Sequence, residues 1–163
     1  MKRFSFFTLI LILLFITTHS WGQSKYEKML RDAETNYEAG NYSKAMSSLA
    51  KFKKKAFKKL GQQNVYTPAY YMLLAKYNLA SGYITDFESN LSLAITNSKS
   101  IDKENSQAYG VKLVEAAELH NLNGSFRISR EFLLQAQSVL DAGGFMKDVI
   151  KGQYSLALGE ALT

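Results

Sequence analysis

Few side chains in this chain could carry out catalysis. His120 is the one histidine that follows the apolar N-terminal stretch, and the residues three and four positions after it are Asn123 and Gly124. A zinc site needs several His, Cys or carboxylate ligands close together, and none stands at helical spacing after His120. A lone histidine among apolar residues is typical of a packed structural position. We therefore expect His120 to be structural, and we expect no metal site.

The remaining motifs argue against an enzyme in the same way. Ser48-Leu-Ala-Lys51 matches a Ser-x-x-Lys pattern, but the companion motifs of that enzyme class are missing. Asp102 to Ser106 lacks the glycine and the final glutamate of a calcium-binding loop. The chain has no cysteine, which excludes disulfides and thiolate metal sites, and it has no glycine-rich phosphate loop. We expect no catalytic residue and no cofactor.

A basic run is the strongest charge feature. It places six lysines within nine residues, namely Lys51, Lys53, Lys54, Lys55, Lys58 and Lys59. One interpretation is a contact for anionic membrane, nucleic acid or an acidic partner. The other is a solvated helix face near a helix C-terminus, where lysine suits the helix dipole. Phe52, Ala56 and Phe57 interrupt the run at helical spacing, which favours the second interpretation.

The N-terminus has the pattern of a secretory signal peptide over residues 1–22. Lys2 and Arg3 precede an apolar run from Phe4 to Ile16, and Ser20 and Gly22 are the small residues of a cleavage site. The apolar run is shorter than the roughly 20 residues that span a bilayer. We expect cleavage after Gly22 and an exported, periplasmic or extracytoplasmic bacterial protein. An uncleaved membrane anchor is the alternative.

The elements that must position these residues repeat along the chain. Gly40, Gly82 and Gly124 recur every 42 residues, each seven residues after a small residue and two before a large apolar one. A small residue, Gly159, also stands 42 residues after Ala117, where a fourth copy would have its small residue. Glycine can end a helix in a left-handed conformation, and a fixed period of this length marks a repeat architecture. Each copy is therefore expected to be two antiparallel helices, with the apolar residue after the turn covering their core.

Start and stop signals place the helices. Capping-box patterns at Ser24–Glu27 and Thr85–Glu88 predict two helix starts, and Thr67-Pro68 predicts a third. The expected helices begin near Ser24, run from Asn41 to Leu60, from Thr67 to Ala80, from Thr85 to about 94–96, from about Glu104 to Leu122 and from Phe126 to Leu140, followed by a last apolar segment from Phe145.

At these positions the chain resembles the tetratricopeptide repeat family. The first copy matches best, at Ala33, Gly40, Tyr42 and Ala45; the others match more loosely, at Ala75, Gly82 and Ala94 and at Ala117, Gly124, Phe126 and Ala136. Phe87 and Ser129 stand where the family has a small residue early in the second helix. The resemblance implies an all-α, right-handed solenoid of antiparallel helix pairs over 23–163, with about three and a half repeats at 26–67, 68–109, 110–151 and, in part, 152–163.

The resemblance also implies a peptide-binding groove along the first helix of each pair. Carried over by position, its three rows are Glu34, Lys76, Glu118 and Glu160, then Tyr37, Leu79 and Asn121, then Leu30, Met72 and Val114. Such a groove suits an extended or helical peptide, but Glu34 and Glu118 would repel a C-terminal carboxylate. Ordinary surface or packing between repeats is the alternative reading of each residue.

The expected function is that of an exported scaffold for a protein or peptide partner, with no small-molecule substrate and no nucleic acid. The final helix, Tyr154 to Leu162, lacks the polar face of a solenoid cap. The chain would then be the N-terminal sensing or docking part of a larger signalling protein, with membrane contact only through a downstream region or an uncleaved signal. The alternative function is anionic membrane or nucleic-acid binding through residues 51–59.

Overall fold

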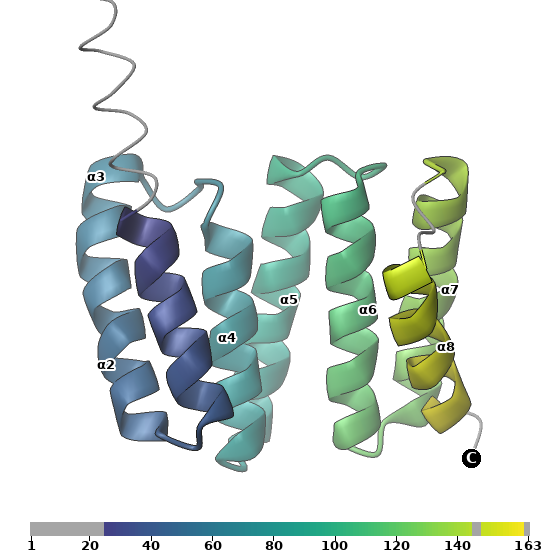
Figure 1. Cartoon of the computed structure of the whole chain (residues 1–163), viewed down its shortest axis with the longest axis horizontal. Coiled ribbons are helices and arrows are strands. Elements are labelled where there is room, and N and C mark those ends of the chain that lie inside the picture. Colours follow the sequence, from purple (N-terminus) through teal and green to yellow (C-terminus); the bar gives the residue numbers. More distant parts are fainter. Residues whose placement is uncertain (1–24, 145–147, 162–163) are drawn as a thin grey trace, which may run out of the picture. The chain divides into compact units, whose positions relative to one another are not determined.

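The computed structural model of the chain describes residues 25–144 and 148–161, and within these ranges it is helical without any strand (Figure 1). The expected all-α class is confirmed. The helices group into two compact units, residues 1–59 and 60–163. The expected signal peptide lies outside the described residues. None of the helices within the described ranges has the length and apolarity needed to cross a membrane.

The first unit is a helical hairpin. Its helices are 25–38, α2 (Tyr42–Phe52), the π-helical turn η1 (Lys53–Phe57) and α3 (Lys58–Leu60). The Tyr26 ring meets the Phe52 ring edge-on at 6.2 Å, and the Tyr37 and Tyr42 rings lie 5.6 Å apart. The start of helix 25–38 therefore lies beside the end of α2, which makes the two helices antiparallel.

The second unit contains five helices, α4 (Thr67–Ala80), α5 (Ile84–Ile101), α6 (Gln107–Leu122), α7 (Phe126–Ala142) and α8 (Asp148–Ala161). The closest packing joins α4 to α5 and α6 to α7, and α6 also packs against α5 and α8. One core cluster draws Met72 from α4, Phe87 from α5 and Leu119 from α6. Two further clusters join α6 to α7 and, through Ala157, to α8.

Three turns have the same left-handed backbone. Gly40, Gly82 and Gly124 have φ angles of 72°, 75° and 73°. At Gly124, its N–H donates to the Asn121 carbonyl at 2.9 Å, and the Ser125 N–H donates to the His120 carbonyl at 2.8 Å. The corresponding pairs of bonds close the turns at Gly40 and Gly82. These bonds are the Schellman motif, so the three expected helix ends are confirmed.

Burial follows the same 42-residue period. Four sets of three residues at this spacing are buried, and no member exposes more than 2% of its surface. The sets are Ala33, Ala75 and Ala117; Ala45, Phe87 and Ser129; Leu49, Leu91 and Leu133; and Phe52, Ala94 and Ala136. The repeat in the sequence is therefore also a repeat of core positions.

Two expectations about the repeat are wrong. The apolar residues two positions after the turn glycines do not close the core, because Tyr42, Ile84 and Phe126 are 41%, 43% and 44% exposed. The residues three positions further on, at the start of the second helix, are the ones that are buried. The fourth copy also departs from the period, because Gly159 is exposed and Ala157 is the buried residue of α8.

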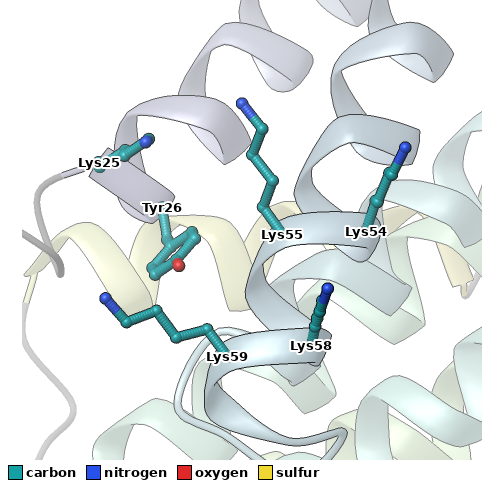
Figure 2. A pocket seen from close by; sticks show the side chains of 6 residues that line it. All are labelled: Lys25, Tyr26, Lys54, Lys55, Lys58 and Lys59. Carbon is teal, nitrogen blue, oxygen red and sulfur yellow. The ribbon is translucent and has the colours of Figure 1, made fainter.

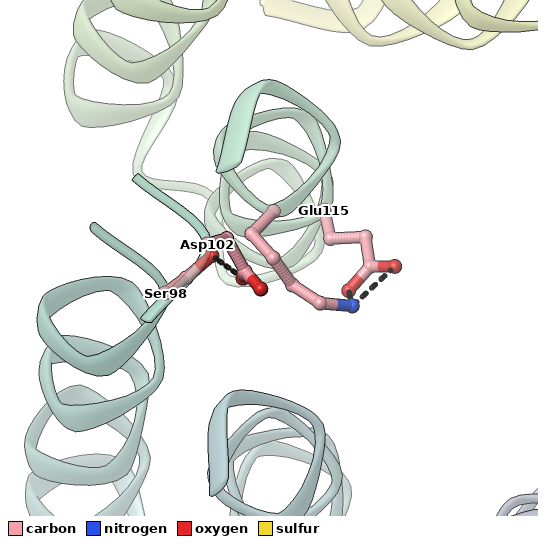
Figure 3. Close-up of polar contacts among 4 residues, drawn as sticks. Ser98, Asp102 and Glu115 are labelled. Atoms are coloured by element: carbon pink, nitrogen blue, oxygen red, sulfur yellow. Dashed lines mark hydrogen bonds and ion pairs between the residues drawn. The ribbon is translucent and has the colours of Figure 1, made fainter. Parts of the chain in front are cut away.

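The second capping-box prediction is also wrong. Helix α5 begins at Ile84, because only Tyr83 separates the turn at Gly82 from the helix, and the Tyr83 side chain makes no cap bond. Helix α5 then continues to Ile101, five residues beyond its expected end. Ser98 donates to Asp102 Oδ2 at 2.6 Å at this end (Figure 3). Ser24, in the first capping-box pattern, lies outside the described residues.

Helix α6 starts later than expected. It begins at Gln107, and the Ser106 hydroxyl accepts a hydrogen bond from the Tyr109 N–H at 3.2 Å. One turn on, Lys112 donates to both carboxylate oxygens of Glu115 at 3.0 and 2.8 Å (Figure 3). The cap bond and the ion pair both stabilise helix α6.

The contact between α6 and α7 leads to a stability prediction. A Cβ atom at Gly110 would lie 2.6 Å from Leu140 Cδ2 and 2.7 Å from Leu140 Cγ. Overpacking should outweigh the better helix propensity of alanine, so Gly110→Ala should lower the free energy of unfolding by about 1–2 kcal/mol. Gly159→Ala is the matched control, because a Cβ there meets nothing within 4 Å. Urea unfolding that finds both variants equally stabilised would contradict the close approach.

Candidate functional site

Three side chains of the expected charged row act on one another in the second unit. Glu118 of α6 is half-buried, and this burial raises the pKa of its carboxyl group. The carboxylates of Glu115 and Glu160 raise the Glu118 pKa further, whereas the Lys76 ammonium lowers it. Residues 76, 118 and 160 come from α4, α6 and α8, so residues 42 positions apart do lie close enough to interact.

Asn121, expected in the next row, joins two helices instead of facing a ligand. It is buried, and its Nδ2 donates to the Ala157 carbonyl at 2.8 Å and to Glu160 Oε2 at 3.3 Å. The first of these bonds ties α6 to the backbone of α8. Leu79, from the same row, is half-buried. Asn121 therefore stabilises the unit and orients Glu160.

The expected apolar row belongs to the core. Leu30, Met72 and Val114 are all buried. Met72 packs in the cluster with Phe87, and Val114 packs in the next cluster with Leu140. The prediction that these three residues line a groove is wrong, because they hold helices together and leave little surface for a ligand to touch.

In the first unit, Glu34 and Tyr37 are half-buried on helix 25–38. In the second unit, Glu160 of the expected groove is exposed, and Lys76, Leu79 and Glu118 are half-buried. This surface carries opposite charges and an apolar patch within one unit.

His120 fills the junction of three helices. It is 2% exposed on α6, with the Phe87 ring of α5 edge-on at 5.5 Å and the Phe132 ring of α7 stacked at 5.4 Å. Its Nδ1 makes no hydrogen bond within the described residues, and Glu88 Oε1 lies 3.8 Å away. Two aromatic neighbours and no hydrogen-bonded base describe a packing residue, which is the role expected from the sequence.

The lysine run forms a second charged surface. All six of its lysines are exposed, and four of them line a pocket of about 530 Å³. The lining residues are Lys54, Lys55, Lys58 and Lys59 together with Lys25 and Tyr26 from helix 25–38 (Figure 2). Lys51 and Lys53 do not line it. Sequence reasoning missed Lys25 and Tyr26, although a hairpin brings the start of one helix beside the end of the next.

Both surfaces carry charged side chains. Within the described residues, no cluster of three His, Cys, Asp or Glu side chains could hold a metal ion. Comparison of the chain with models of protein families, with curated proteins and with solved structures gave no match.

The burial of His120 leads to a pH prediction. Burial lowers the pKa of His120, and the nearby Glu88 carboxylate offsets only part of this effect. The unfolded chain therefore takes up the proton at a higher pH than the folded chain does. Stability should be full above the ordinary histidine pKa and should fall as the pH drops through and below it.

Urea unfolding across this pH range measures the effect. His120→Asn introduces the residue found at positions 36 and 78 and should remove the dependence that this group causes. An equal pH slope in wild type and His120→Asn would contradict the prediction.

Proposed function

We propose that this chain is a scaffold of stacked, tetratricopeptide-like helix pairs that binds a protein or peptide segment. The observation that carries the proposal is the threefold recurrence of one turn with one burial pattern. Gly40, Gly82 and Gly124 end helices in the same conformation, and the core positions around them recur at the same spacing. Repeated hairpins that each hide an apolar face against a neighbour form solenoids, which are mostly binding scaffolds.

The helices of the second unit differ in a way that supports stacking. Helix α6 buries residues on several sides, including Leu113, Ala116 and Leu119, whereas α7 buries one stripe formed by Ser129, Leu133, Ala136 and Leu140. A helix that is buried on several sides lies between neighbours, and an amphipathic helix lies at the outside. A stacked array requires that the first helix of each pair lies between neighbouring helices and that the second helix lies at the outside.

The charges near Glu118 favour one kind of ligand. The Glu118 carboxylate is disfavoured by burial and by the carboxylates of Glu115 and Glu160, with Lys76 as the opposing charge. A basic side chain from a ligand would offset this cost, because an opposite charge nearby favours the ionised carboxylate. A carboxylate would add to the repulsion. We therefore propose a protein or peptide segment that brings a lysine or arginine to Glu118.

Selection from a phage-displayed library of random peptides tests the binding proposal. The peptides selected by the chain should be enriched in basic residues, and Glu118→Lys should abolish their binding. Glu131→Lys makes the same charge change on α7, where Glu131 forms only an exposed ion pair with Arg127, and should keep the binding.

Salt gives a second readout. Binding of a short peptide through one charged contact should change little between about 50 and 200 mM salt, unlike binding of a polyanion. The scaffold proposal fails if no peptide is enriched. It fails equally if Glu118→Lys and Glu131→Lys weaken binding to the same extent.

We further propose that the mature chain is exported. Residues 1–22 have the order of a signal peptide, with two basic residues, an apolar run and small residues at the cleavage site. Expression of the full chain in a bacterium should yield protein in the periplasm, with an intact mass that begins at Gln23. Protein that keeps residues 1–22 and sediments with membranes would contradict cleavage and support a retained anchor.

A further inference from the structure

The pocket beside Tyr26 gathers positive charge from two helices. We propose that Lys25, Lys54, Lys55, Lys58 and Lys59 form a binding site for a compact polyanion that carries two or more phosphate groups. The proposal goes beyond the scaffold function and does not depend on it, since every lining residue belongs to the first unit. Figure 2 shows the Tyr26 ring between the side chains of Lys25, Lys55 and Lys59.

The hairpin gives the pocket a fixed wall. Tyr26 is buried and meets Phe52 edge-on at 6.2 Å, and Phe52 in turn meets Phe57 at 6.0 Å. This aromatic contact holds the first turn of helix 25–38 against the end of the second helix. The helical segments that carry the lysines are therefore held side by side around one pocket.

The charge in the pocket is uncompensated. Its lining includes five lysines and no carboxylate. Within the described part of the chain, none of these five lysines forms an ion pair. Ammonium groups of like sign repel one another, so a multivalent anion would relieve the repulsion as well as gain contacts.

Size and charge narrow the ligand class. A volume of about 530 Å³ falls within the range of roughly 300–1,000 Å³ that is usual for small-molecule sites. One phosphate monoester carries roughly −1.5 to −2 charges near neutral pH, so at least two such groups are needed to approach five positive charges. Lysine binds phosphate as a point charge, without the fixed fork by which arginine selects a planar carboxylate.

The backbone at this place is also unusual. Residues Lys53–Phe57 form a π-helical turn inside an otherwise α-helical segment. Such turns are rare and are often found at functional sites. Lys54 and Lys55 lie within the turn, and Lys58 and Lys59 follow it directly. The irregular turn thus coincides with the residues that line the pocket.

Isothermal titration calorimetry of the full chain with inorganic pyrophosphate tests the site. Lys55→Gln combined with Lys59→Gln should weaken binding by about tenfold or more, since a hydrogen bond to a charged group is worth about 1.5–3 kcal/mol. Lys51→Gln with Lys53→Gln is the matched control, because it removes the same charge from the same run outside the pocket. Lys25→Gln should also weaken binding, although it lies outside the run. Circular dichroism and urea unfolding check that each variant is folded.

Binding to lipid vesicles distinguishes a lipid headgroup from a soluble phosphate ligand. Phosphatidylcholine vesicles that contain a phosphoinositide should bind the chain in competition with pyrophosphate if the natural ligand is a lipid headgroup, and should not bind it if the ligand is soluble. Either result keeps the site. The proposal is overturned if pyrophosphate does not bind, if both double variants lose affinity equally, or if duplex DNA binds and pyrophosphate does not compete with it.

Discussion

The structure depends on one backbone conformation, the left-handed residue that ends the first helix of each hairpin. Gly40, Gly82 and Gly124 adopt it within a few degrees of one another. Residues with a Cβ atom enter this region only at a cost, so the position favours glycine. The N–H groups of the glycine and of the residue after it donate the bonds that close the turn. The second helix begins directly after that residue. This fixed connection sets the register of the two helices, which is why the same four positions are buried in each copy.

Within that constraint the copies are not interchangeable. One of the four buried sets holds Ala45, Phe87 and Ser129, which differ widely in volume. The large ring of Phe87 reaches the His120 ring of the following hairpin, and Phe132 closes the other side of the imidazole. Interiors pack to near-crystalline density, so a large residue in one copy requires a matching neighbour. His120 thus packs at the junction between these two hairpins.

The parts that the sequence predicted are those governed by local backbone chemistry. The glycine spacing predicted the positions of the turns, and the helical periodicity predicted the buried sets of residues. The prediction failed where tertiary contacts decide. Met72 and Val114 looked like groove residues, yet their helices are covered on more than one side. Helix α5 continues through a polar segment and ends at the Ser98–Asp102 hydrogen bond. Lys25 and Tyr26 line the pocket because their helix pairs with the segment that carries the lysine run.

The helix dipole acts differently on the lysines at the two ends of the pocket. Lys58 and Lys59 stand at the end of a helical segment, where the dipole favours cations. Lys25 is the first described residue of helix 25–38, and the sequence predicts that this helix begins at Ser24; at a helix start the dipole favours anions, so a lysine there is unfavourable. Sequences tend to break local rules at functional positions. Helix stability alone accounts for Lys58 and Lys59 but not for Lys25, whereas an anion held between the two helices accounts for all three.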